Sequence, residues 1–438
     1  MAVLTVLDLR GDRRDPTDRL PRGAVDLASA RAAVGEILTE VRTRGDDAVR
    51  DLTERFDHVR PEQLAVDPET LRRSLQELTG DVRAALEQAA AQIRWFHQQA
   101  RPADWTAERG GARLGQRFRP LHRVGVYVPG GQAAYPSSVL MSVVPAQVAG
   151  VDEIVLCTPP TGSDGLPDRT ILAAAAMLGI DAVFGVGGAQ AVAAMAYGTG
   201  TVPRCDKIVG PGNLYVALAK QLVQAEGRCG AEGFAGPTEV AIIADASADP
   251  RLVAADLVAQ AEHDELASCL LVTPDPALVE AVADALRREV ATTRHRQRVE
   301  TALAGQGAAV IVDDLDHAVE VVDAFAPEHL EVQTADPVSV AERVRFAGAI
   351  FVGASTPVSL GDYAAGPNHT LPTARTARFR GGLTTSDFLV AVNWVHYDES
   401  SLRDLAPTVR ALSAAEDLPA HARAVDLRVD GNGSARMP

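Results

Sequence analysis

Lysine is nearly absent from this chain of 438 residues, which contains only Lys207 and Lys220. Neither lysine stands in a GxxxxGK[ST] pattern, so the sequence excludes a P-loop nucleotide site. A mechanism through a lysine Schiff base would have only these two residues to use. Arginine is abundant, and this imbalance is better explained by genomic base composition than by function.

Cysteine is also scarce, and no two cysteines form a CxxC pair. This spacing argues against a structural zinc knuckle and against a redox motif. We expect the four side chains to be small buried hydrophobes, at Cys157, Cys205, Cys229 and Cys269.

Long apolar runs and an excess of positive charge are missing as well. The longest apolar runs, such as 171–180, are far shorter than the roughly 20 residues that span a bilayer, and the N-terminal sequence has no apolar core of a signal peptide. The net charge of -16 disfavours the basic face that nucleic-acid binding requires. We therefore expect a cytoplasmic protein that binds neither membranes nor nucleic acid.

The remaining composition is that of a globular protein, and its periodicity predicts an α/β fold. The length exceeds the roughly 250 to 300 residues at which one core stops growing, so at least two domains are expected. Residues 31–100 show helical periodicity, and 113–128 alternate like a hairpin that runs into a strand. A helical tail closes the chain, with short helices opened by Pro407 and Pro419.

Between these regions, short β-branched runs alternate with helical stretches, which is typical of parallel sheets covered by helices. The runs lie at 154–157, 182–184, 207–209, 240–244, 270–272, 310–312 and 349–352. The stretch 227–237 divides them into two blocks. This division favours two doubly wound domains, with a single large barrel as the alternative.

Three glycine-containing turns follow expected strands and precede expected helices, at 127–131, 185–190 and 210–213. Doubly wound sheets bind ligands at the carboxyl ends of their strands, and helix N-termini favour anions, so these turns suit a phosphate. None completes GxGxxG, because Gln190 and Tyr215 stand where the third glycine would. Ordinary βα turns also use glycine, so the pattern alone leaves a nucleotide site open.

Two residue pairs carry side chains suited to metal binding or proton transfer. Gln260 and His263 are three residues apart on an expected helix, which places them on one face as two metal ligands or as ordinary surface residues. Glu328 and His329 are proton-transfer groups of different basicity. Neighbours on a strand point to opposite faces, so both reach one site only if the turn at Pro327 distorts the backbone.

The stretch 361–373 gives up hydrophobic periodicity for Gly, Pro, Asn, Asp and His. It is either a shaped loop or a solvated surface turn, and it places Asp362, Asn368 and His369 where we expect neither helix nor clean strand. His421 belongs to the helical tail and, taken alone, is best interpreted as an exposed helix residue.

Taken together, four segments resemble histidinol dehydrogenases, and they are QAEHD (260–264), APEHLE (326–331), GDYAAGPNHTLPT (361–373) and EDLPAH (416–421). The resemblance covers essentially the whole chain and includes VYVPGG, VGPGN and AGPTEVAIIAD. It implies two degenerate Rossmann-like domains, together with N-terminal helices and a small helical C-terminal tail used in dimerisation.

The resemblance also implies a reaction and a set of site residues. Members oxidise L-histidinol to L-histidine in two hydride transfers to NAD, through a bound aldehyde, and a zinc ion orients the substrate. Residues matching the zinc ligands are Gln260, His263, Asp362 and His421. By the same resemblance, His329 takes the alcohol proton and Glu328 helps to activate the water that hydrates the aldehyde.

The family's other contacts also have counterparts here. Positions matching the NAD contacts are Tyr127, Gln190 and Asn213. Positions matching the substrate contacts are Thr238, His369 and Glu416, beside Gln260, His263, His329, Asp362 and His421. Thr238 departs from the serine expected in GPSE, which keeps the hydroxyl but puts a contact distance in doubt.

The expected domain division follows the same resemblance. Residues 25–127 and 238–382 form a first Rossmann-like domain that carries most of the metal site, and 128–237 form a second on the NAD side. Residues 1–24 are expected to pack with the C-terminal region, 383–438. In the implied homodimer, that region completes the partner subunit's site.

Two other classes of function remain as alternatives. One is a metal hydrolase or lyase that keeps this fold but has lost NAD, and the other is a non-catalytic binding protein. Tyr127, Gln190 and Asn213 argue against the first, and Glu328 with His329 argue against the second.

Overall fold

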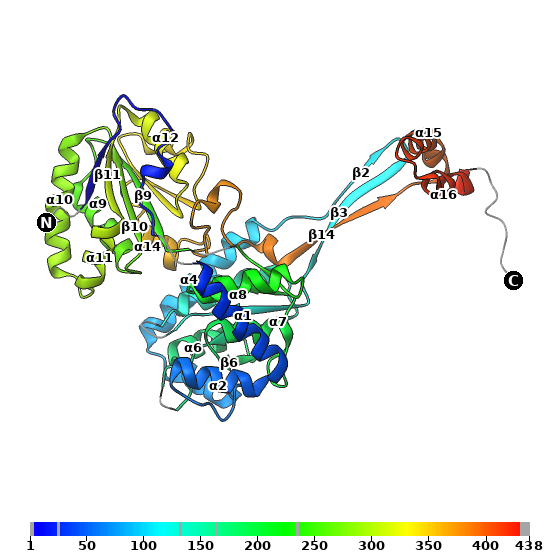
Figure 1. The fold of residues 1–438 in the computed structure, drawn as a ribbon, viewed down its shortest axis with the longest axis horizontal. Coiled ribbons are helices and arrows are strands. Elements are labelled where there is room, and N and C mark those ends of the chain that lie inside the picture. Colours follow the sequence, from blue (N-terminus) through cyan, green and yellow to red (C-terminus); the bar gives the residue numbers. More distant parts are fainter. Residues whose placement is uncertain (1–3, 24–26, 131–133, 163, 234–235, 430–438) are drawn as a thin grey trace. The chain divides into compact units, whose positions relative to one another are not determined.

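The computed structural model describes residues 4–23, 27–130, 134–162, 164–233 and 236–429. The chain separates into two compact units, whose elements are labelled in Figure 1. The first unit comprises Met1–Ala100 and Leu121–Phe388, and the second comprises Arg101–Pro120 and Leu389–Pro438. Within the described residues, no helix is both long enough and apolar enough to cross a membrane.

A six-stranded parallel sheet in the first unit has the order β1-β11-β10-β9-β12-β13. Its strands are β1 (Thr5–Asp8), β9 (Glu239–Ala244), β10 (Ser268–Thr273), β11 (Gly307–Ile311), β12 (His329–Gln333) and β13 (Ala349–Val352). Val240 and Ile242 of β9 face one apolar core, and Ala241 and Ile243 face another. Both faces of the sheet are therefore buried, as in a doubly wound fold.

Helices on each face of this sheet form the two cores. The first core takes side chains from α9 (Pro250–Ala261), α10 (Pro276–Thr292), α11 (Arg296–Gln306) and α14 (Val358–Tyr363). The second takes them from α12 (Leu315–Phe325) and α13 (Pro337–Ala341). This arrangement confirms the predicted parallel sheet with helices on both sides.

A five-stranded parallel sheet in the same unit has the order β6-β5-β4-β7-β8. Its strands are β4 (Arg123–Tyr127), β5 (Glu153–Thr158), β6 (Val183–Gly185), β7 (Lys207–Val209) and β8 (Gly230–Ala231). The surrounding helices are α1 (Leu27–Arg44), α2 (Asp46–Asp57), α3 (Pro68–Glu77), α4 (Gly80–Gln99), α5 (Pro136–Ala149), α6 (Arg169–Met177), α7 (Gly188–Tyr197) and α8 (Leu214–Ala225). All four cysteines of the chain are buried and free, as predicted.

The expected boundary at 237/238 falls between β8 of the five-stranded sheet and β9 of the six-stranded one, whereas the sheets differ from the expectation for residues 25–127. Helices α1 and α2 pack against α7, and α1 also packs against α8, so residues 27–57 belong to the five-stranded sheet and not to the six-stranded one. β4 is the central strand of the five-stranded sheet, and a boundary after residue 127 would cut it from its neighbours. Helical periodicity identifies a helix but carries no information about which sheet it covers.

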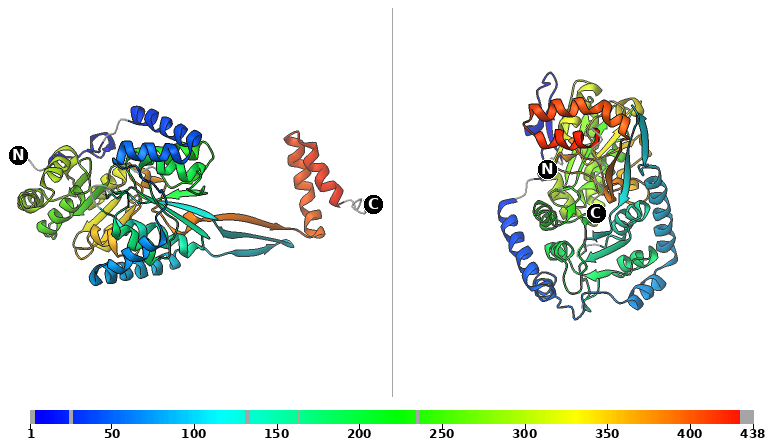
Figure 2. Two further views of the ribbon diagram at one scale, coloured as in Figure 1. Left: turned by 90° about the horizontal axis from the view of Figure 1, so that it is seen from below. Right: turned by 90° about the vertical axis from the view of Figure 1, so that its right-hand side faces the viewer.

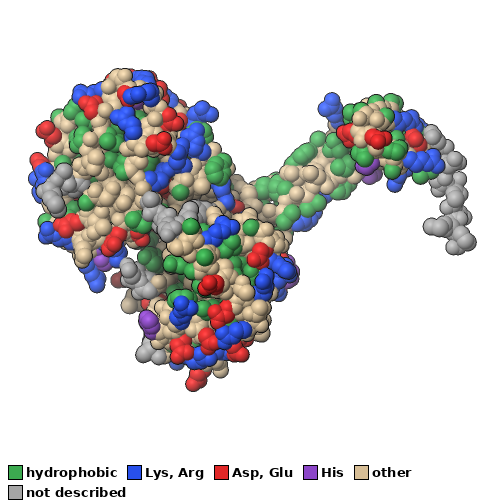
Figure 3. Space-filling model, in the orientation of Figure 1, with side chains coloured by type: hydrophobic (Ala, Val, Ile, Leu, Met, Phe, Trp, Pro, Cys, Tyr) green, Lys and Arg blue, Asp and Glu red, His purple; other side chains and the backbone are tan. Residues whose placement is uncertain are grey.

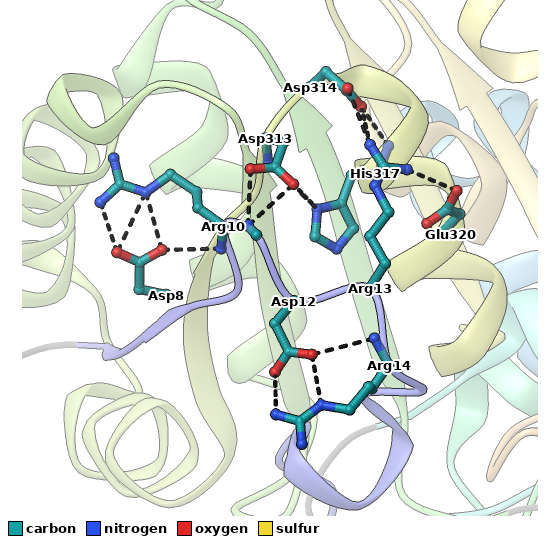
Figure 4. Close-up of polar contacts among 10 residues, drawn as sticks. Asp8, Arg10, Asp12, Arg13, Arg14, Asp313, Asp314, His317 and Glu320 are labelled. Atoms are coloured by element: carbon teal, nitrogen blue, oxygen red, sulfur yellow. Dashed lines mark hydrogen bonds and ion pairs between the residues drawn. The ribbon is translucent and has the colours of Figure 1, made fainter.

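The N-terminal segment, whose expected packing with the C-terminal region stays a prediction, is attached to the six-stranded sheet. β1 pairs in parallel with β11, from Thr5 beside Ala308 to Asp8 beside Ile311, so the segment extends the six-stranded sheet. Beyond β1, Gly11 N donates to Asp313 at 2.9 Å, and Arg13 pairs with Asp314 and Glu320 at 3.1 and 2.8 Å (Figure 4). Such exposed ion pairs contribute little each, so the strand pairing is the main attachment.

The second unit is an antiparallel sheet followed by two helices. Its strands are β2 (Trp105–Arg109), β3 (Ala112–Pro120) and β14 (Leu389–His396), in the order β14-β3-β2. Helices α15 (Glu399–Ala415) and α16 (Pro419–Val429) pack side by side (Figure 2). Pro407 lies inside α15 and does not open a helix, because the helix begins earlier, after its N-cap Asp398.

Candidate functional site

The candidate catalytic residues meet at the amino ends of β9 and β12. Thr238 directly precedes β9, Glu328 directly precedes β12, and His329 is the first residue of β12. They line a cavity of about 720 Å³, together with Asn213, His263, Asp362 and His369. These residues therefore lie at the edge of the six-stranded sheet opposite to the carboxyl ends, where doubly wound sheets usually bind ligands.

The carboxyl edge of the six-stranded sheet is poorly suited to an anionic ligand. Four of the helices that follow its strands begin at an aspartate whose carboxylate accepts a backbone N–H, and these caps are Asp249, Asp275, Asp314 and Asp336. Such a cap occupies the helix N-terminus and adds negative charge there. In the five-stranded sheet, α7 begins at Gly187 without a side-chain cap and α8 begins at the neutral Asn213. The N-termini of α7 and α8 therefore carry no capping carboxylate that would offset the positive end of the helix dipole.

The Glu328 carboxylate is fixed by two donors beside β9. Its Oε2 accepts from Thr238 Oγ1 at 2.5 Å and from Glu239 N at 2.9 Å. Burial raises the pKa of Glu328 to about 7, and the two donors partly oppose this shift. The group is therefore near the point where it gives and takes protons at neutral pH.

His329 is held as a neutral base. Its Nδ1 lies 3.1 Å from the Glu239 carbonyl oxygen, which can only accept, so the proton is on Nδ1 and Nε2 keeps its lone pair. Burial lowers the pKa of the ring. Ala326, with φ of 48°, turns the chain before Pro327, and both Glu328 and His329 line the cavity. Glu328 precedes His329, the first residue of β12, so the alternation of side chains along a strand does not apply to this pair.

Three candidate metal ligands come from α9, from the turn that follows it and from α14. α9 ends at Ala261, so Gln260 is in its last turn and His263 lies just beyond the helix, contrary to the prediction that the helix carries both. His263 Nε2 is 3.8 Å from Asp362 Oδ2. Two ligands of one tetrahedral zinc are separated by about 3.4 Å at bond lengths of about 2.1 Å, so this pair is close to the spacing that zinc needs.

The orientation of the Gln260 amide follows from its neighbour. Thr238 donates its only hydroxyl proton to Glu328, so it accepts from Gln260 Nε2, at 2.6 Å. Gln260 Oε1 is buried and has no hydrogen-bond partner among the described residues. An orphaned buried oxygen beside a histidine and a carboxylate fits a metal ion as its partner. No group of three His, Cys, Asp or Glu side chains suited to a metal occurs in the described part of the chain.

The stretch 361–373 is a shaped and largely buried loop. Its start is the end of α14, so Asp362 lies in a helix, contrary to expectation. Asn368 donates to the Met141 carbonyl at 2.5 Å and accepts from Thr370 N at 2.9 Å, so its side chain holds the turn. His369 Nδ1 contacts the Asp362 carbonyl at 3.0 Å, and burial lowers the pKa of His369 to about 4. The loop is therefore not a solvated surface turn.

Of the three positions matching NAD contacts, only Asn213 lines the cavity. Its side chain caps α8 by accepting from the N–H groups of Tyr215 and Val216, at 3.1 and 3.2 Å. Tyr127 is buried, and its hydroxyl accepts from Gly188 N at 3.1 Å. Gln190 is also buried, and its Nε2 has no partner in the described part of the chain. Gly131, in the first turn, lies outside the described residues.

Two cavity features escaped the sequence patterns. Ser138 Oγ lies 3.3 Å from His369 Nε2, and nothing in the spacing of the α5 sequence marks it. Lys220 is buried in α8, where its Nζ donates to the Gly210 carbonyl and to Glu232 Oε1 at 2.6 Å.

Glu416 and His421 belong to the second unit. Glu416 ends α15, and His421 lies in the first turn of α16. Both are exposed within this unit. Their part in the site stays a prediction.

These features define an α/β protein in which a candidate acid–base pair adjoins a set of candidate metal ligands. The family model for histidinol dehydrogenase matches residues 20–429. The chain belongs to the histidinol dehydrogenase family, a family of oxidoreductases.

Individual relatives agree with this assignment. A histidinol dehydrogenase of Thermobifida fusca is 50% identical over 431 residues, covering 98% of each chain. One of Mycolicibacterium smegmatis is 51% identical over 419 residues, covering 94% of each. The crystal structure of histidinol dehydrogenase from Elizabethkingia anophelis matches with a TM-score of 0.94 at 29% identity, covering 99% of this chain and 100% of that one.

Proposed function

We propose that this protein is a zinc-dependent, NAD-linked enzyme that oxidises L-histidinol to L-histidine through bound histidinaldehyde, the last step of histidine biosynthesis. The observation that carries the proposal is the meeting of Glu328, His329, His263 and Asp362 in one cavity, in a chain of this family. The buried Gln260 Oε1 adds a third candidate ligand beside them.

Gln260, His263 and Asp362 would hold the zinc ion, with His421 of a second copy as the fourth ligand. Three neutral ligands and one carboxylate leave a net positive ion with room for substrate atoms, as in a catalytic site. When bound, zinc supplies a Lewis acid that orients the imidazole and amino nitrogens of the substrate. Thr238 supports this role by directing the Gln260 oxygen away from its own hydroxyl.

His329 would accept the proton of the substrate hydroxyl through Nε2, because Nδ1 is committed to the Glu239 carbonyl. Glu328 would draw a proton from the water that hydrates the aldehyde, which requires its ionised form. His369 is held neutral and bonded to the backbone, which suits a substrate contact and not a base.

NAD, when bound, accepts the hydride in each oxidation. Asn213, Tyr127 and Gln190 would contact it at the carboxyl ends of β7, β4 and β6. The helix termini there carry no acidic cap, so they favour the dinucleotide's diphosphate. Gly210 supports the close turn, because a Cβ atom on it would lie 2.0 Å from the Tyr127 carbonyl oxygen.

A homodimer would bring Glu416 and His421 to the site of the partner subunit. The second unit exposes large apolar side chains on β14 and α15, including Val395 at 66% and Leu412 at 58%, and Figure 3 shows hydrophobic side chains over this unit. Such exposure favours an interface. We also propose that the protein is cytoplasmic and binds neither nucleic acid nor membranes.

The test is an assay of NADH formation from L-histidinol and NAD. Zinc-loaded protein should reduce NAD, chelation should abolish the reaction, and added zinc should restore it. No NADH from the zinc-loaded protein would refute the proposal. NAD-induced thermal stabilisation without turnover would instead indicate an enzyme with another substrate.

A further inference from the structure

A second polar cluster lies beneath the candidate site, and the proposed mechanism does not use it. Glu331 Oε1 accepts from Val358 N at 2.8 Å. Gln333 Nε2 donates to both Glu331 Oε2 and Asp256 Oδ2, at 2.9 and 3.0 Å. A further hydrogen bond joins the Asp256 and Glu331 carboxyl groups. The cluster therefore ties together α9, β12 and the start of α14.

Three members of this cluster, Asp256, Glu331 and Val358, each lie one structural repeat from a site residue. Asp256 precedes Gln260 by four residues of α9, and Val358 precedes Asp362 by four residues of α14, a displacement of about 6 Å in each helix. Glu331 follows His329 by two residues of β12, a displacement of about 6.6 Å on the same face.

The displacements point the same way. α9 connects the parallel strands β9 and β10, so it runs antiparallel to them and to β12. The step from Gln260 back to Asp256 along α9 therefore has the same direction as the step from His329 forward to Glu331 along β12. α14 runs from Val358, bonded to Glu331, to Asp362, whose charge acts on His329. The site and the cluster thus form two parallel layers on the same three elements.

We infer that Glu331, bonded to Asp256, Gln333 and Val358 N, is a positioning residue that holds Gln260, His329 and Asp362 at one level. This inference rests on the proposed function, because Gln260 and Asp362 are the metal ligands proposed there.

The chemistry of the cluster suits a rigid support. Burial and the neighbouring Asp256 carboxylate raise the pKa of Glu331, so the two acids share a proton and do not repel each other. α14 begins at Pro357, which offers no side-chain cap, so Glu331 supplies the acceptor that Val358 N needs. Removing that acceptor would free the N-terminus of the short helix that carries Asp362.

The test compares zinc affinity in three variants, measured by competition with a chelator. Glu331→Ala removes every bond of the side chain and should weaken zinc binding by roughly 10- to 100-fold, as loss of a ligand's support typically does. Glu331→Gln keeps an acceptor for Val358 N and a donor for Asp256 but places an NH2 group against Gln333 Nε2, so its zinc affinity should fall between those of wild type and Glu331→Ala. Val310→Ala, at a buried residue of β11 in the second core, is the control for a general loss of stability and should bind zinc normally.

Several outcomes would overturn the inference. The inference is wrong if Glu331→Ala binds zinc as tightly as wild type. It is also wrong if Val310→Ala, at the same thermal stability as Glu331→Ala, loses as much zinc affinity. Should Glu331→Ala not fold, Gln333→Met removes only the bridging amide, and wild-type zinc affinity in that variant would overturn it too. Wild-type protein that binds no zinc would instead refute the proposed function, so the two failures are distinguishable.

Discussion

Glu328→Gln should make the metal-free protein more stable at alkaline pH. Burial raises the pKa of Glu328 from 4.5 to about 7, so the folded state binds this proton more tightly than the unfolded state. Wild-type protein therefore loses stability as the pH rises from about 4.5 to about 7. This pKa shift of about 2.5 units lowers the free energy of unfolding by about 3 kcal/mol in total. About 2.5 kcal/mol of that loss falls between pH 5 and pH 8. The glutamine variant lacks this loss.

Urea denaturation of metal-free protein at pH 5 and pH 8 measures the effect. The free energy of unfolding of the variant, relative to wild type, should rise by about 2 to 3 kcal/mol between the two pH values. Glu320→Gln, at an exposed glutamate, is the matched control and should give no such difference. A pH-independent difference for Glu328→Gln, or one of opposite sign, would contradict the burial argument.

Three further predictions concern the site. His329→Asn should lower kcat by roughly 100- to 10,000-fold while leaving the far-ultraviolet circular dichroism spectrum unchanged, and near-normal turnover would exclude His329 as the base. Thr238→Val should weaken zinc binding because the Gln260 amide loses its partner, whereas Thr238→Ser should keep both bonds; equal chelator-competition curves for the two would contradict this. Mixing inactive His329→Asn with inactive His421→Asn subunits should restore part of the activity if the tail serves the partner's site, and no recovery after verified subunit exchange would count against it.

The sequence predicted the fold class because β-branched runs and helical stretches alternate clearly. Its motifs indicated Glu328 and His329 as a proton-transfer pair, which stays a prediction, and both line one cavity because Glu328 lies before the first residue of β12. The motifs also indicated Asp362 and His369, whose roles stay predictions, and both line the same cavity although Asp362 lies in α14 and not in a loop.

The misplaced features share one physical cause, which is that local patterns do not report tertiary partners. Nothing in the periodicity of α1 indicates that it covers the five-stranded sheet, and nothing in residues 5–8 indicates pairing with β11. The same limit hid the cluster around Glu331, since Asp256 and Val358 are about a hundred residues apart. The candidate site lies at the amino edge of the six-stranded sheet, where Thr238 before β9 contacts Glu328 before β12. These residues are far apart in the sequence, so no local pattern predicts their contact.

The most direct test of the central claim is the ratio of NADH to histidine formed from L-histidinol by the zinc-loaded protein. The account predicts two NADH for each histidine, with no aldehyde released, because the same cavity performs both oxidations. One NADH for each L-histidinol consumed, with free histidinaldehyde and no histidine, would contradict it.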